Sequence, residues 1–158
     1  MELCVLGSGS SGNCIYIAAG ATRMLIDAGL SLRALRARLK TLECDVTDLA
    51  AVLVTHEHSD HCLGLPALAR AHPALRLLAN ESTAAGVEQA VRGNGSLSWD
   101  IFETGAAFEI GALRVQSFSV PHDAGDPVAC VLDDGSSRLG IATDLGIATP
   151  VVRRHLRD

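Results

Sequence analysis

Residues 55–61, Thr-His-Glu-His-Ser-Asp-His, place four potential metal ligands close together. His56 and His58 are two residues apart, so in extended backbone their side chains project from the same side and can share one cation. Asp60 and His61 follow where the chain must turn, and they can face a second cation. Imidazole and carboxylate together suit zinc, manganese or iron. Because two such ions can activate water and stabilise a displaced oxyanion, the spacing predicts a hydrolytic metal site.

A single histidine in a loop is more often an ordinary surface or core residue than a metal ligand. The chain has only six histidines, and three of them fall within this run. The run also follows the apolar segment 50–54, which is typical of a strand buried on both faces. The clustering therefore favours a metal site over chance.

The string His-x-His-x-Asp-His resembles the signature of the metallo-β-lactamase-fold hydrolases. Further segments resemble the cytoplasmic YycJ/WalJ-like branch of that family, and they come in the family's order. These segments are residues 3–13, 24–29, 120–124 and 140–146. The resemblance implies an α/β fold, a four-layer αββα sandwich built from two mixed sheets.

The resemblance also implies a set of six metal ligands. One metal would be held by His56, His58 and His122, the other by Asp60 and His61, with Asp144 bridging both. Asp60 is in addition the candidate catalytic residue. Up to two ions per chain, Zn²⁺ or alternatively Mn²⁺ or Fe²⁺, would activate a water that attacks phosphorus or a carbonyl carbon. Taken alone, His122 could be an ordinary loop histidine and Asp144 a helix N-cap.

Two further carboxylates are candidates for a supporting role. In similar proteins an acid at the position of Asp27 accepts a hydrogen bond and orients the histidine loop, although an aspartate before Gly29 also suits a turn. Asp123 is a second candidate for this outer position. Cys62 is expected to be a small core residue rather than a ligand. The sequence identifies no substrate-binding residue.

The elements that must position these residues follow from the hydrophobic pattern. Strands are predicted over 3–6, 15–18, 23–26, 50–54, 75–79, 108–110, 113–120, 128–132 and 139–142. Helices are predicted over 32–42 with Ser31 as cap, and over 63–71, 81–91 and 150–157. The early alternation of strand and helix indicates an α/β layered domain. The glycine-rich segment 7–12 lacks the Gly-Lys-Ser/Thr ending of a P-loop, so we expect a hairpin loop at the rim of the site.

Composition sets the class of protein. A chain of 158 residues with 48% hydrophobic residues is expected to form one packed domain, residues 1–158. Five cysteines without a Cys-x-x-Cys pair indicate a reducing compartment, and neither a signal peptide nor a membrane-length apolar run is found. We therefore expect a cytoplasmic protein with no membrane partner. The net charge of −5 is not that of a typical nucleic-acid binder, although basic residues cluster at 33–40 and 153–157.

Proteins of this kind supply a further histidine to the second metal from a strand beyond the Asp144 segment. The sequence stops at Asp158, and His155 falls too early, within a predicted helix, to be assigned that role. We therefore expect a domain that lacks its final strand or strands and helix, with a weak second metal site. Apolar surface left exposed would favour a homo-oligomer.

The function favoured by the resemblance is a metal-dependent phosphodiesterase or nuclease, similar to a 5′–3′ DNA exonuclease, with DNA as a possible substrate. One alternative is a thioester or ester hydrolase of the glyoxalase II type, because its dinuclear ligand pattern is the same. Another is a non-catalytic metal-binding module, motivated by the short C-terminus. Antibiotic lactamase activity is disfavoured because no export signal is present.

Overall fold

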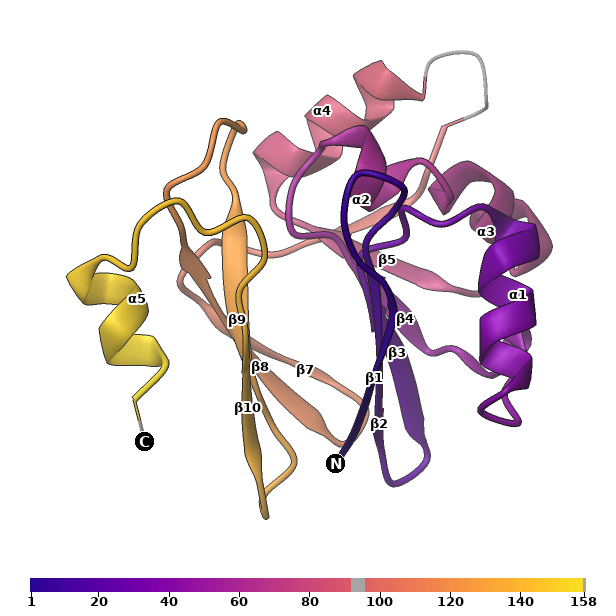
Figure 1. The fold of residues 1–158 in the computed structure, drawn as a ribbon, viewed down its shortest axis with the longest axis horizontal. Helices are drawn as coiled ribbons and strands as arrows, with labels where there is room; N and C mark the ends of the chain where they lie inside the picture. Colours follow the sequence, from indigo (N-terminus) through magenta and orange to yellow (C-terminus); the bar gives the residue numbers. More distant parts are fainter. Residues whose placement is uncertain (92–95, 158) are drawn as a thin grey trace.

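The computed structural model describes residues 1–91 and 96–157. Two β-sheets pack face to face and helices cover both outer faces, so the layers run helix, sheet, sheet, helix (Figure 1). This arrangement confirms the four-layer α/β sandwich. No helix in the described part of the chain combines the length and the apolar character that crossing a bilayer requires.

The first sheet has six strands among the described residues. In spatial order they are β1 (Glu2–Gly7), β2 (Cys14–Ala19), β3 (Thr22–Ile26), β4 (Ala51–Leu53), β5 (Arg76–Ala79) and β6 (Trp99–Ile101). β1 to β3 pair antiparallel, and β3 to β6 pair parallel, so this sheet is mixed as expected. Because β3 and β4 are parallel neighbours, the segments that follow them emerge at the same edge of the sheet. That edge carries both Asp27 and the histidine motif.

The second sheet is formed by β7 (Ala107–Ile110), β8 (Leu113–Ser119), β9 (Val128–Asp133) and β10 (Arg138–Ile141), in the order β10-β9-β8-β7. All three pairings among its described strands are antiparallel, which corrects the expectation that both sheets are mixed. The reason lies in the connections. Short loops at 111–112 and 134–137 join neighbouring strands as hairpins, and a hairpin can only be antiparallel.

Among the described residues, three apolar cores hold the four layers together. The first lies between the first sheet and the helices α1 (Leu32–Lys40), α3 (Leu65–Ala71) and α4 (Glu81–Ala90). The second lies between the two sheets and includes Ile17, Leu53 and Val115. The third lies between the second sheet and α5 (Pro150–His155), where Phe118 and Val152 are buried. Figure 1 shows α5 alone on the outer side of the second sheet.

The local structure around the motif differs from the predicted helix over 63–71. The chain forms a short helix, α2 (Ser59–Cys62), and then α3 begins at Leu65 with Pro66 in its first turn. Gly64 separates the two helices, and a Cβ there would overlap the backbone carbonyl of Leu30. This tight approach explains why a residue without a side chain stands between the two helices. The sequence pattern also missed β6, which has only three residues and therefore a weak period-2 signal.

Candidate metal centre

The predicted ligands are carried by segments from both sheets. His56 and His58 follow β4 in extended backbone, and α2 carries Asp60 and His61. His122 follows β8 of the second sheet, and Asp144 follows β10. All of these segments reach the same end of the sandwich, at the top of Figure 1. The site is therefore built where the two sheets open toward each other.

Three histidines form the first candidate metal group. The ligand atoms offered by His56, His58 and His122 lie within 4.8 Å of one another. Nδ1 of His58 is 3.2 Å from Nε2 of His56 and 3.1 Å from Nε2 of His122. These three residues are the ones predicted for the first metal, and the fold brings them together.

The outer ring nitrogens of these histidines have protein partners. Nε2 of His58 is 3.2 Å from the carbonyl oxygen of Asp123, and Nδ1 of His122 is 3.1 Å from the carboxylate of Asp123. A nitrogen that faces an acceptor must carry the proton, so the opposite ring nitrogen has a free lone pair. In both rings that lone pair faces the centre of the group. Asp123 thus lies where the sequence placed a supporting carboxylate, although its side chain is 87% exposed.

His56 is oriented by Thr55. The Thr55 hydroxyl lies 2.9 and 3.0 Å from the two carboxylate oxygens of Asp27, and it has only one proton to donate to them. It must therefore accept from Nδ1 of His56, which is 3.0 Å away. Nε2 of His56 consequently has its lone pair directed at the other histidines. Three lone pairs that face one another repel, and a bound cation removes that repulsion.

The second candidate group consists of His56, His61 and Asp144. Nε2 of His61 is 2.7 Å from Oδ2 of Asp144, and Nε2 of His56 is 3.6 Å from the same oxygen. Oδ2 of Asp60 lies 3.7 Å from Nε2 of His61, beside this group. Asp144 therefore lies beside both groups, as a bridging ligand must. His56 belongs to both groups, whereas the sequence assigned it to the first metal alone.

Asp27 is buried directly behind His61. Its Oδ1 accepts a hydrogen bond from the backbone N–H of Thr55 at 2.8 Å, and its Oδ2 lies 2.7 Å from Nδ1 of His61. The backbone of Asp27 has φ = 62°, in the left-handed region that non-glycine residues rarely adopt, and Asp144 has φ = 49°. The fold thus maintains strained backbone at two carboxylates of the site.

The pKa values of the two buried histidines, His56 and His61, are shifted in opposite directions. The pKa of His56 is lowered to about 4, mainly by burial and then by the charge of His61, while the charge of Asp27 opposes the shift. For His61, burial acts to lower the pKa, but the hydrogen bond and charge of Asp27 and the charges of Asp144 and Asp60 raise it overall. The positive charge of a protonated His61 would therefore offset the surrounding carboxylates. A divalent cation would supply positive charge at the same place, so the donor set fits a metal centre.

Two residues that support the site had no assigned role in the sequence. Thr55 was overlooked as the residue that sets the tautomer of His56. Asn13 precedes β2, and its Nδ2 lies 3.0 Å from Oδ2 of Asp60 and 2.9 Å from Nε2 of His61. The N–H of Gly9 donates to Oδ1 of Asn13 at 2.9 Å, so the glycine-rich segment 7–12 does lie at the rim of the site. A lone asparagine or threonine gives no sequence signal for such contacts.

Cys62 is a core residue, as the sequence indicated. Its thiol is buried and donates to the backbone carbonyl of Glu57. Burial raises the pKa of this thiol to about 12, with smaller contributions from the charges of Asp27, Asp60 and Glu57. The thiolate that a metal would require is therefore disfavoured at neutral pH.

Residues 22–158 match the beta-lactamase superfamily domain. The chain belongs to the beta-lactamase superfamily. Within this superfamily it is 38% identical over 149 residues to the exodeoxyribonuclease YycJ of Bacillus anthracis, which covers 92% of the chain and 55% of that relative. It is 39% identical to the exodeoxyribonuclease WalJ of Streptococcus pneumoniae, over 78% of the chain and 46% of the relative. The chain thus spans about half the length of these curated relatives.

Solved structures of the superfamily share the fold. A metallo-β-lactamase of Cronobacter sakazakii (HARLDQ motif mutant S60) aligns with a TM-score of 0.73 over 96% of this chain and 68% of that chain, at 18% identity. The subclass B3 metallo-β-lactamase BJP-1 of Bradyrhizobium japonicum gives 0.67 over 81% of this chain and 53% of that chain, also at 18% identity. The metallo-β-lactamase fold implies divalent-metal binding, and the histidine cluster is the candidate site for it.

Proposed function

We propose that this chain provides the metal site of a metal-dependent hydrolase that cleaves phosphodiesters, with DNA ends as the substrate and 5′–3′ exonucleolytic cleavage as the reaction. The observation that carries the proposal is the convergence of imidazole lone pairs and the Asp144 carboxylate at one point between the sheets. The two relatives named exodeoxyribonucleases support the choice of a phosphodiester over other substrates.

The proposed site holds up to two ions, zinc or alternatively manganese or iron. His56, His58 and His122 would hold one ion, His61 and Asp60 the other, and Asp144 would contact both. Bound divalent ions supply Lewis acidity, which activates water and neutralises negative charge at the reacting group. Neutral imidazole and carboxylate donors suit all three metals, so the ligand set does not choose among them.

Residues of the chain then orient the reactants. Asp27 keeps the proton of His61 on Nδ1, so that Nε2 faces the site. Asn13 holds the Asp60 carboxylate, whose side chain is 31% exposed, so Oδ2 of Asp60 can accept a hydrogen bond from the attacking water. We propose Asp60 as the catalytic residue for this reason. The leaving group has no assigned proton donor.

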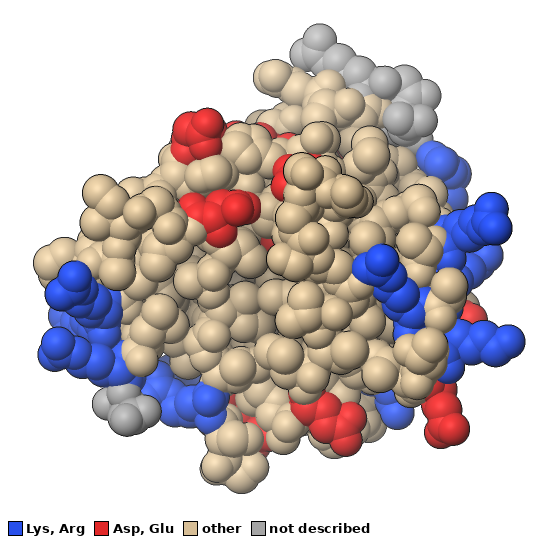
Figure 2. Space-filling view, in the orientation of Figure 1, with Lys and Arg blue, Asp and Glu red and all other residues tan. Residues whose placement is uncertain are grey.

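The charge distribution bears on a DNA substrate. Figure 2 shows Lys and Arg gathered at two opposite ends of one face, over α1 on the right and α5 on the left. The exposed basic residues on these two helices and just after α5 are Arg33, Arg36, Arg38 and Lys40 on α1, and Arg153, Arg154 and Arg157 on and after α5. The site between them is acidic, so we expect DNA binding to need divalent cations and to weaken with salt.

The test is cleavage of bis-p-nitrophenyl phosphate and of DNA with a free 5′ end in Mn²⁺ or Zn²⁺, with EDTA as the inhibitor. Metal content by elemental analysis gives an independent readout. The His56→Ala/His58→Ala double variant should lose both its most tightly held metal and its activity. Unchanged metal content in this variant would contradict the assignment of the first site.

A thioester or ester hydrolase is the second candidate. The chain is 26% identical over 145 residues to an atrochrysone carboxyl ACP thioesterase of a Cryptosporiopsis species, which covers 91% of the chain and 41% of that relative. The same donor set could act on a thioester carbonyl. Rapid thioester hydrolysis without phosphodiester cleavage would favour this candidate. Stoichiometric metal binding without turnover of either substrate would instead favour a metal-binding module.

We further propose that the chain can self-associate through β1, an edge strand of the first sheet. Leu3 and Val5 on this strand are 47% and 56% exposed, and an exposed apolar edge favours pairing with a second chain. Sedimentation analysis of the protein and of Val5→Lys tests this. A concentration-dependent dimer that the lysine abolishes is expected, and a strictly monomeric parent protein would exclude it.

A further inference from the structure

His122 lies on a loop that has little structure of its own. Residues 121–127 join β8 to β9 without forming a helix or strand, and most of them are exposed or half-buried. The base of the loop is closed by a hydrogen bond from Val120 N–H to the carbonyl of Pro127 at 3.0 Å. A metal ligand needs placement to within about 0.5 Å. Contacts from other elements to the middle of the loop must therefore fix the position of His122.

The first contact comes from Glu57, which lies between two of the candidate ligands. Its Oε1 accepts a hydrogen bond from the N–H of Gly125 at 2.7 Å. The side chain packs on α4, where a Cβ on Gly86 would lie 2.6 Å from Cγ of Glu57. The position of Glu57 is thus fixed by a helix on one side, and it holds the loop on the other. The same residue also connects the His122 loop to the backbone that carries His56 and His58.

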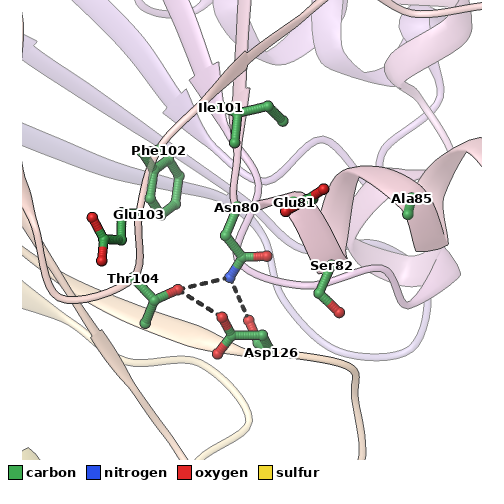
Figure 3. Close-up of a pocket in the computed structure, with 9 residues that line it drawn as sticks. All are labelled: Asn80, Glu81, Ser82, Ala85, Ile101, Phe102, Glu103, Thr104 and Asp126. Carbon is green, nitrogen blue, oxygen red and sulfur yellow. Dashed lines mark hydrogen bonds between the residues drawn. The ribbon is translucent and has the colours of Figure 1, made fainter.

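The second contact is a chain of hydrogen bonds at the far side of the loop (Figure 3). Nδ2 of Asn80 donates to the backbone carbonyl of Asp126 at 2.7 Å and to Oγ1 of Thr104 at 3.0 Å. The Thr104 hydroxyl donates to Oδ2 of Asp126 at 2.7 Å. Oδ1 of Asn80 is occupied by the N–H of Thr83, because Asn80 is the N-cap of α4. Each hydrogen bond among Asn80, Thr104 and Asp126 therefore has a defined donor and a defined acceptor.

This second contact is anchored in the first sheet. Asn80 directly follows β5, and Thr104 lies just past β6. Residues at the ends of two strands therefore hydrogen-bond to Asp126 of the loop. Asn80 is 4% exposed, which shields its hydrogen bonds from competing water. Thr104 and Asp126 also line an open cavity of about 720 Å³ together with exposed Glu103. A substitution at Thr104 therefore removes a hydrogen bond to the loop without disturbing a fully buried core.

We propose that Glu57 and the Asn80–Thr104–Asp126 chain clamp the 121–127 loop from two sides and so place His122 opposite His58. These are positioning residues, since they act through the loop and do not touch the metal group. The inference rests on the proposed function because it takes His122 as a metal ligand. Loss of either contact should loosen the first metal site while leaving His56 and His58 intact.

The test is titration of the metal-free protein with Co²⁺, whose visible spectrum reports the ligands of the ion. Glu57→Ala and Thr104→Val should each weaken Co²⁺ binding about tenfold or more and alter the spectrum. Glu57→Gln keeps the acceptor for Gly125, and Thr104→Ser keeps the hydroxyl, so both should remain within about twofold of the parent protein. Glu103→Ala is the matched control, because this exposed residue lines the same cavity.

Amide hydrogen exchange of Gly125 in the metal-free protein is the second readout, and it needs no metal. Both disruptive variants should speed this exchange about tenfold, and both conservative variants should leave it slow. Unchanged exchange, or Co²⁺ affinity and spectrum equal to the parent in Glu57→Ala and Thr104→Val, overturns the clamp. A parent protein that fails to bind Co²⁺ overturns the proposed function, and the exchange of Gly125 then decides the clamp separately.

Discussion

At the scale of single residues, the site is defined by which ring nitrogen of each histidine is engaged. Thr55 accepts from His56, Asp27 accepts from His61, and the backbone and carboxylate of Asp123 face two more rings. These partners sit outside the cluster and leave the inner nitrogens available. The residues around the histidines therefore determine which ring nitrogens are free to hold a metal.

The first residue-scale prediction concerns Asp27→Asn. One carboxylate oxygen of Asp27 accepts from Thr55 N–H and the other from His61, so an amide, with only one acceptor oxygen, cannot serve both. We expect metal affinity of the His61 group to fall about 10–100-fold and stability to fall by about 1–3 kcal/mol. Calorimetric zinc titration and urea unfolding measure the two effects. Asp123→Asn, at an exposed carboxylate, should change affinity less than about threefold.

A second residue-scale prediction concerns pH and His56. The pKa of His56 is lowered from 6.5 in the unfolded chain to about 4 in the folded protein, first by burial. The unfolded chain binds more protons between these values, so the contribution of His56 is present above about pH 6.5 and is lost as pH falls toward 4. Unfolding midpoints in EDTA should therefore fall across this window. The fall should be shallower in His56→Gln, and equal slopes in the two proteins would contradict the burial of a neutral His56.

At the scale of elements, each helix is held by the layer that it covers. α5 shows this most simply, because Val152 is its buried residue, 1% exposed against Phe118, Val120 and Val131 of the second sheet. The neighbouring Val151 is 50% exposed. Val152 thus anchors the outer helix together with the ring of His155, which stacks on Phe118 at a centroid distance of 4.5 Å. The helix α5 follows the loop that carries Asp144.

The element-scale prediction compares these two valines. Val152→Ala removes buried methyl groups and should lower the free energy of unfolding by about 1–3 kcal/mol. Val151→Ala, with the same chemical change at an exposed position, should stay within about 0.5 kcal/mol of the parent. Urea unfolding monitored by circular dichroism measures both. Equal effects of the two substitutions would mean that α5 does not pack on the second sheet as described.

At the scale of the whole molecule, the candidate centre joins the two sheets. His56 and His58 follow β4 of the first sheet, while His122 and Asp144 follow β8 and β10 of the second. An ion bound there would connect two layers that otherwise meet through the apolar core between them. We propose the 158-residue chain as one domain whose halves are linked in this way.

The whole-molecule prediction is that zinc stabilises the folded protein and EDTA reverses the effect. A ligand that binds only the folded state at a hundredfold excess over its dissociation constant adds about 2.7 kcal/mol. Differential scanning fluorimetry measures the shift, and hydrogen exchange should slow in loops of both sheets. The His56→Ala/His58→Ala variant should show little shift. Protection confined to the first sheet would contradict a centre that bridges the sandwich.

Local features of the sequence determined much of this protein. The apolar run before Thr55 predicted β4, and all three residues of β4 are buried. The spacing of His56 and His58 predicted that they face one centre, and their ring nitrogens lie 3.2 Å apart. Such inferences hold because burial of a short strand and projection at period two depend only on neighbouring residues. The resemblance of the longer motifs predicted the superfamily, which the match over residues 22–158 confirms.

Only the tertiary structure decided which distant residues meet. Hairpin connections made the second sheet antiparallel throughout its described strands, against expectation. The packing of β3 beside β4 brought Asp27 to His61, and the loop before β2 brought Asn13 to Asp60. The packing of the two sheets also placed His56 beside Asp144. Contacts of this kind depend on strand order and on the meeting of two sheets, and a chain read residue by residue contains no local pattern for either.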